Sequence, residues 1–145
     1  MDYIEGSIGR VFIARIDHNE DLIKELETLS LSKNIKAAFF ILLGAIGKAS
    51  LVTGPKEKTI PPDPNWRDFG DAREILGVGN IFWENNYPKI HLHAVVSKGE
   101  DVLAGCIRGK TETYLVIEVF IIELIGVSAK RIYEEKIGVS PIVFF

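Results

Sequence analysis

Cysteine is almost absent from this sequence, since Cys106 is the only one among its 145 residues. A single cysteine cannot close an intramolecular disulfide, so the fold does not depend on an oxidising compartment. Blocks of lysine and arginine are also absent, and the net charge is −3 at neutral pH. This balance argues against a general electrostatic affinity for nucleic acid, which requires a positively charged surface.

The sequence also lacks an apolar run long enough to form a membrane-spanning helix. Its two longest apolar stretches, 37–52 and 114–127, are interrupted by glycine, lysine or glutamate. The first five residues are acidic and lack the basic start of a signal peptide. We therefore expect a soluble protein of the cytoplasm.

The residues that are present are typical of one globular domain, with 47% apolar and 26% charged side chains. Apolar residues at helical spacing predict one main helix at about 20–32, and Asp17 to Asn19 offer candidates for its N-cap. Short connections between the remaining segments favour antiparallel pairing, so we predict an α+β fold around a mostly antiparallel sheet. The predicted strands lie at 9–16, 36–43, 49–53, 73–83, 91–96, 102–107 and 111–124.

Two segments interrupt this strand pattern. Gly44 and Gly47 are predicted to bound a tight connection between the strands at 36–43 and 49–53. The stretch 54–71 is polar and contains several prolines, which predicts a surface excursion or a functional loop.

The strand at 115–124 carries apolar side chains on both of its faces. Such a strand must be covered on both sides, and the sequence offers only one strong helix as a cover. We therefore expect a second copy of the chain to provide the other cover, which predicts a homo-oligomer.

The most specific signal in the sequence is the pair His91 and His93, followed by a turn at Gly99-Glu100 and then by Cys106. If the two strands pair around this turn, His93 lies opposite Cys106, and His91 lies on the same face because strand side chains alternate. Two imidazoles and one thiolate at these separations could bind one transition-metal ion, with zinc as the expected metal.

A simpler interpretation of these three residues stays open at this point. A His-x-His pair is often the half-exposed polar face of a strand, and a lone cysteine is often a small buried apolar residue. A bulge of one residue in either strand would also turn the Cys106 side chain to the opposite face.

Two charged residues are candidate neighbours of the cluster. Arg108 would face His91 in the same register, where it could hold a small anion such as a carboxylate or phosphate. The alternative is a surface or interface ion pair with Glu84 or Glu118. Glu118 itself, in an otherwise apolar strand, could orient a ligating imidazole or form a structural salt bridge. No nucleophile elbow, P-loop or dinucleotide fingerprint is present, so no catalytic residue is predicted.

The order of these motifs resembles the PPC domain (plant and prokaryote conserved). The resemblance covers about residues 9–124 and is carried by Glu74-Ile75-Leu76, His91-Leu92-His93, Ala104-Gly105-Cys106-Ile107 and Glu118-Val119. Members of that family typically carry Gly-Gly-His-Leu at the third of these positions. Cys106 stands in place of that histidine, so the resemblance implies a His-His-Cys cluster at which a good metal ligand is retained.

The resemblance also implies a single domain over 1–145 and a homotrimer. The function it implies is that of a metal-containing protein, with one ion per chain and an open coordination position for a small ligand or partner. One alternative is a DNA-associated, transcription-related protein. Arg-Gly-Arg-Pro AT-hooks, which read the minor groove in the plant proteins, are absent here. The other alternative is a metal-dependent hydrolase, although no general base is predicted nearby.

Overall fold

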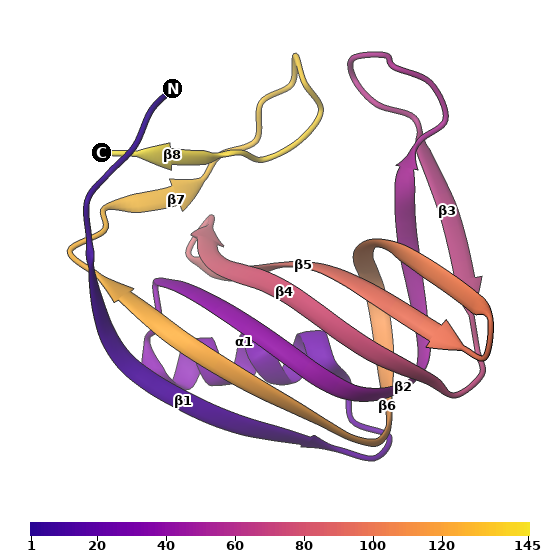
Figure 1. Ribbon diagram of the computed structural model, residues 1–145. Coiled ribbons are helices and arrows are strands. Elements are labelled where there is room, and N and C mark those ends of the chain that lie inside the picture. Colours follow the sequence, from indigo (N-terminus) through magenta and orange to yellow (C-terminus); the bar gives the residue numbers. More distant parts are fainter.

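The computed structural model describes residues 1–145 and contains one helix among eight strands (Figure 1). The expected α+β architecture with a mostly antiparallel sheet is confirmed. The elements in chain order are β1 (Ser7–Asp17), α1 (Leu22–Lys33), β2 (Ala37–Pro55), β3 (Pro64–Phe69), β4 (Arg73–Glu84), β5 (Tyr87–Lys98), β6 (Asp101–Ile125), β7 (Ala129–Arg131) and β8 (Ile142–Phe144).

The predicted helix is confirmed as α1, with a shift of its first residue. Its N-cap is Asp21, not Asp17 to Asn19, because the Asp21 carboxylate accepts hydrogen bonds from the backbone N–H groups of Ile23 and Lys24 at 3.1 and 3.3 Å. Thr111 of β6 donates a further hydrogen bond of 2.7 Å to the same carboxylate. The start of the helix is therefore fixed by tertiary contact with β6.

Six strands form one sheet in the order β1-β6-β5-β4-β2-β3, and every pairing is antiparallel. An additional pairing between β6 and β2 closes the sheet on itself. The closed interior and α1 together enclose a core of 20 buried apolar residues, including Leu22, Leu26, Phe40, Leu92 and Ile121. The outer face of the sheet is the side opposite this core.

Two of the predicted connections are corrected by the structure. Gly44 and Gly47 do not bound a turn, because β2 runs continuously through both and bends there, with shifts in its pairing to β6. At Gly44, φ is +144° and a Cβ atom would collide with the Val116 carbonyl oxygen, so the bend requires glycine. Likewise, 102–107 and 111–124 are parts of one 25-residue strand, β6.

The segment 54–71 is only partly the loop that its prolines predict. Residues 64–69 form β3, which pairs with the end of β2, from Ala49↔Phe69 to Pro55↔Pro64. This places β3 at the edge of the sheet, where proline is tolerated because one side of the strand needs no hydrogen-bond donors. The β2–β3 hairpin projects from the sheet on the same side as β7 and β8 (Figure 1).

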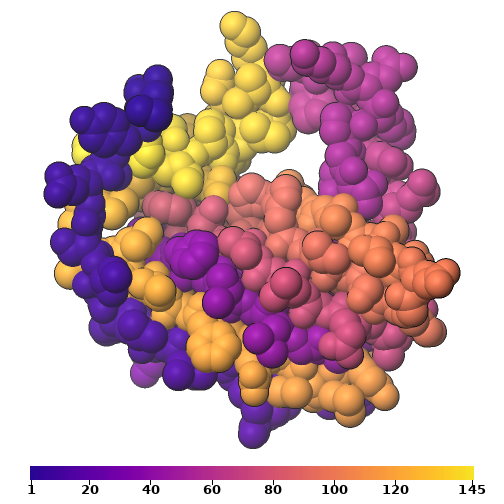
Figure 2. All heavy atoms as spheres, in the orientation of Figure 1, coloured from indigo at the N-terminus to yellow at the C-terminus, as the bar shows by residue number.

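The C-terminal segment 126–145 folds back over the outer face and ends in the β7–β8 pair. Its turn reaches the loop between β2 and β3, where a Cβ atom on Gly138 would lie 2.7 Å from the Pro61 Cβ. Figure 2 shows the surface hollowed beneath this contact, between the C-terminal segment and the hairpin. The structure contains no helix with the length and apolar character needed to cross a bilayer.

Candidate metal centre

The predicted register of the β5–β6 hairpin is confirmed. His93 lies directly opposite Cys106, and the pairing continues to Lys98↔Asp101 around the turn at Gly99-Glu100. No bulge intervenes between the cysteine and the turn, so the Cys106 side chain lies on the same face as His93. His91 lies two residues earlier in β5, and the rings of the two histidines pack edge to face with centroids 5.0 Å apart. One ligand atom from each of His91, His93 and Cys106 lies within 4.8 Å of the others.

The cluster lies on the outer face of the sheet. Backbone pairing connects Val78 of β4 to His93, His93 to Cys106, and Cys106 to Val52 of β2, which in turn pairs with Trp66 of β3. Along this row the histidine is exposed, whereas Cys106 is only 5% exposed. The cluster therefore combines a buried sulfur with an imidazole accessible from solvent.

His91 contacts an arginine from the C-terminal segment. The Arg131 guanidinium lies 3.3 Å from His91 Nδ1, and it donates hydrogen bonds to Asn80 Oδ1 at 2.8 Å and to the Ser140 carbonyl at 2.7 Å. Burial lowers the pKa of His91 to about 4, and the positive charges of Arg131, His93 and Arg108 act in the same direction. His91 is therefore neutral at physiological pH, which is the form of imidazole that binds metals.

Burial has the opposite effect on the thiol. It raises the pKa of Cys106, and the positive charges of Arg108 and Arg131 partly oppose the rise. A metal ion that binds the sulfur must therefore displace a proton from it. The two arginines favour the thiolate that results.

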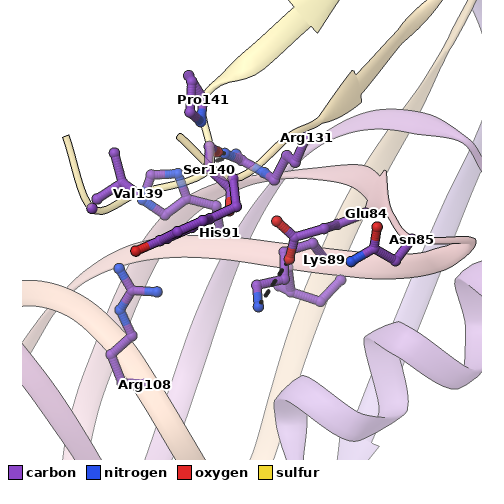
Figure 3. A pocket seen from close by; sticks show the side chains of 12 residues that line it. Glu84, Asn85, Lys89, His91, Arg108, Arg131, Val139, Ser140 and Pro141 are labelled. Atoms are coloured by element: carbon purple, nitrogen blue, oxygen red, sulfur yellow. Dashed lines mark hydrogen bonds and ion pairs between the residues drawn. The ribbon is translucent and has the colours of Figure 1, made fainter. Parts of the chain in front are cut away.

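Two neighbouring cavities open onto the cluster. The first, of about 670 Å³, has His91, Arg108, Arg131 and the Glu84–Lys89 ion pair in its walls. The second, of about 830 Å³, contains His93, Cys106 and the apolar residues Val52, Pro55, Pro62, Pro64 and Trp66. Arg108, Gly138 and Val139 line both cavities. Figure 3 shows Arg108 entering the first cavity from β6 and Arg131 from the C-terminal segment, with His91 between them in this view.

Of the two predicted neighbours of the cluster, Arg108 lines both cavities and Glu118 lines neither. The prediction that Arg108 faces His91 in the β5–β6 register is wrong, because that pairing ends at His93↔Cys106 and Arg108 pairs with Ser50 of β2. Its side chain nevertheless lines the first cavity together with His91. It forms no salt bridge within the chain, so the alternative of a surface ion pair with Glu84 or Glu118 is not found there. Glu118 is exposed, lies opposite Leu43 and Arg15, and lines neither cavity.

Comparison with known proteins decides the family. Residues 3–125 match the model of the Plants and Prokaryotes Conserved (PCC) domain, which is the PPC domain of the resemblance above. The chain belongs to the PCC family. No curated protein matches it.

Solved structures of PCC-like fold agree with this assignment. A metal-containing protein from Archaeoglobus fulgidus is 25% identical, with a TM-score of 0.86 over 100% of this chain and 99% of that chain. A plant- and prokaryote-conserved protein from Pyrococcus horikoshii is 19% identical, with a TM-score of 0.83 over the whole of both chains. A "putative DNA binding protein" from Bacteroides thetaiotaomicron is 25% identical, with a TM-score of 0.78 over 96% of this chain and 97% of that chain.

The donor set of this PCC chain fits a transition-metal ion. Zinc binds imidazole nitrogen at roughly 2.0–2.1 Å and thiolate sulfur at roughly 2.3 Å, which places the ligand atoms of a tetrahedral set with one sulfur roughly 3.3–3.6 Å apart. The ligand atoms of His91, His93 and Cys106 span up to 4.8 Å, so small side-chain movements of about 1 Å close the set. A mixed sulfur and nitrogen set also suits zinc better than magnesium or calcium, which prefer oxygen.

The sequence pattern gives no indication that Arg131 belongs to the site. The PCC match ends at residue 125, so the arginine belongs to the segment beyond the part that defines the family. Nothing in the pattern of the short strand β7 indicates that its arginine returns to a histidine 40 residues earlier in the chain. That contact depends on how the C-terminal segment folds across the outer face.

Proposed function

We propose that this chain is a homotrimeric PCC protein that binds one transition-metal ion, expected to be zinc, through His91, His93 and Cys106, and presents it to a small ligand. The observation that carries the proposal is the convergence of three ligand atoms within 4.8 Å in the walls of two neighbouring cavities. The name of the Archaeoglobus fulgidus protein, a metal-containing protein of the same fold, supports the same conclusion.

Three protein ligands leave one coordination position of a tetrahedral ion free for an outside group. When bound there, zinc supplies a Lewis acid, which polarises an oxygen ligand and lowers the pKa of a bound water. The chain's own contribution is to position the ligands. The β5–β6 pairing fixes His93 against Cys106, and burial of the sulfur excludes water from one side of the site.

The test is the metal content of the purified protein. Elemental analysis should find about one zinc per chain in the wild type, and Cys106→Ala and His93→Ala should each lose it. His18→Ala is a matched control, because His18 lies outside the cluster and accepts a hydrogen bond from the Leu115 backbone at 3.2 Å. Full retention of metal by a His91→Ala, His93→Ala double variant would refute the proposal.

The outer face of the sheet supports the trimer. Five apolar side chains on this face are between 40% and 63% exposed: Phe39, Ile41 and Leu43 of β2, and Leu76 and Val78 of β4. Ile41 pairs with Val78, and Leu43 pairs with Leu76, across the two strands. Continuous apolar surface of this kind on a soluble chain marks a contact with another protein. The row containing Val78 leads directly to His93, so the proposed interface reaches the proposed metal site.

A second candidate function is DNA binding, which the name of the Bacteroides thetaiotaomicron protein favours. Phosphate contacts would make the affinity for duplex DNA fall steeply as salt concentration rises. A gel-shift series from low to physiological salt tests this candidate. If no DNA is bound even at low salt, DNA binding is excluded.

A further inference from the structure

The contact with Arg131 limits which nitrogen of His91 can carry a proton or bind a metal ion. The arginine is 9% exposed, and the nitrogen that lies 3.3 Å from His91 Nδ1 also donates to Asn80. A guanidinium has donors only, so Nδ1 must accept in this contact and carries no proton. In a neutral imidazole the proton then lies on the other nitrogen, Nε2. The contact is therefore compatible only with the Nε2–H tautomer of neutral His91.

This tautomer has no nitrogen free for a metal ion. A metal bound through Nδ1 would occupy the lone pair that Arg131 uses. A metal bound through Nε2 would move the ring proton to Nδ1, where a donor would then face the donors of the guanidinium. Either route ends the contact between Arg131 and His91.

The first cavity offers Arg131 a different partner. Arg108 lines the same cavity, and neither arginine forms a salt bridge. Lys89 is paired with Glu84 at 3.5 Å, and the charge of Glu84 also favours the Arg131 cation, so the cavity holds one carboxylate against three cationic side chains. The Nε atom of Arg131 is buried and has no hydrogen-bond partner at all. Two guanidiniums with free donors match the planar oxygens of a carboxylate or the tetrahedral oxygens of a phosphoryl group.

We propose that Arg131 exchanges partners when the cluster takes up its metal, leaving His91 and joining Arg108 to bind the oxyanion of a small ligand in the 670 Å³ cavity. The proposal rests on the proposed function, because the metal ion drives the exchange. It identifies the ligand class as small molecules that carry a carboxylate or phosphoryl group. It also gives the C-terminal segment, which lies beyond the family match, a role in ligand selection.

The exchange makes the metal and the oxyanion cooperative. An oxyanion that draws Arg131 away from His91 frees the imidazole for the metal, and a bound metal frees Arg131 for the oxyanion. Each must therefore raise the affinity of the other by the same factor, and couplings of this kind are typically about 5- to 150-fold.

The first experiment measures the zinc affinity of the full-length protein by competition with a chromophoric chelator. Methylphosphonate and acetate are the two oxyanion probes, and chloride at matched ionic strength is the control. We expect methylphosphonate, acetate or both to tighten zinc binding at least about fivefold, and the stronger probe distinguishes a phosphoryl from a carboxylate ligand. Equal zinc affinity in all three salts would overturn the assignment of an oxyanion site.

Three variants distinguish the exchange of partners by Arg131 from a simple change of charge in the cavity. Arg131→Met removes the group that competes for His91, whereas Arg108→Met removes an equal charge from the same cavity without touching His91. Lys24→Met, on the exposed side of α1, removes a charge from a residue that lines neither cavity. Without oxyanion, Arg131→Met should bind zinc at least about fivefold more tightly than Arg108→Met, and Lys24→Met should match the wild type. Equal zinc affinity of the two arginine variants would contradict the exchange.

The second experiment reads the tautomer of His91 directly, from nitrogen-15 chemical shifts of the imidazole in metal-free protein. The wild type should show Nε2–H, and Arg131→Met should lose this preference while the His18 signals stay unchanged. A proton on Nδ1 in the wild type would overturn the contact on which the exchange depends. Absence of zinc binding in every salt would instead refute the proposed function, so the two failures are distinguishable.

Discussion

His93 and Cys106 lie directly opposite each other across two adjacent strands, near the point at which β6 leaves β5 to continue along β2. The backbone of Cys106 is held from both sides, by pairing with His93 in β5 and with Val52 in β2. Two backbone ladders therefore fix the position from which the sulfur projects, and only rotation of its short side chain is left to place it. A substitution at residue 106 is therefore the most informative test of the proposed metal binding.

Cys106→His should preserve metal binding with altered spectroscopy. The substitution introduces the histidine that the family typically carries, so three ligands remain and about one metal ion per chain is expected. In cobalt-substituted protein, the thiolate-to-cobalt charge-transfer absorption of the wild type should disappear. Cys106→Val is the control, because it keeps an apolar residue of similar size and should lose the metal. Identical cobalt spectra for wild type and Cys106→His would show that the sulfur is not a ligand.

Acid should remove one specific contribution to stability, that of Glu123. Its carboxylate is 11% exposed and accepts hydrogen bonds from Arg10 at 2.6 and 2.7 Å, which hold its pKa below the usual 4.5. Because the folded pKa is lower than the unfolded one, the unfolded chain binds more protons in acid. The contribution is therefore complete above about pH 4.5 and is lost as the pH falls through the lower, folded value.

Chemical denaturation of wild type and Glu123→Gln measures this contribution. At pH 7 the variant should be less stable by about 1–2 kcal/mol. The loss stays this small because Arg10 is half exposed and can donate to water once the carboxylate is gone. The difference should shrink steadily below pH 4.5. Asp63→Asn is the control, because both side chains of its ion pair with Lys56 are more than 60% exposed, and it should change stability by less than about 0.5 kcal/mol. A difference for Glu123→Gln that is constant with pH would contradict the assignment.

The sequence was sufficient to predict the hairpin of the candidate metal site. Strand alternation and a turn at Gly99-Glu100 determine which residue faces His93, and both are local properties. It was not sufficient for β3, since the prolines of 54–71 indicate a loop unless the strand lies at a sheet edge, and edge position is a property of the whole sheet. Arg131 was missed for the same reason, because its contact with His91 is created by the path of the C-terminal segment.

A charge on the outer face should dissociate the oligomer. Ile41 is 43% exposed in the middle of the apolar surface of β2 and β4, so Ile41→Asp would bury a carboxylate in the proposed interface. Leu31 offers a control of almost equal exposure, 42%, on α1 on the other side of the sheet. Light scattering should report a trimer for the wild type and for Leu31→Asp, and a monomer for Ile41→Asp. A trimer that survives in Ile41→Asp would place the interface elsewhere.

Gly79→Ala should weaken the fold and the proposed metal site together. A Cβ atom at this position would collide with the Phe40 ring inside the core and lie 2.6 Å from the carbonyl oxygen of His91 on β5. Overpacking of this kind costs about 1–3 kcal/mol, and here the strain would also push on the backbone that carries the imidazole. Gly70→Ala is the matched control, because a Cβ atom there meets nothing within 4 Å and its φ is not positive. Denaturation midpoints and zinc affinity should both fall in Gly79→Ala and stay unchanged in Gly70→Ala. Loss of stability with full zinc affinity would show that the position of His91 does not depend on this close approach between β4 and β5.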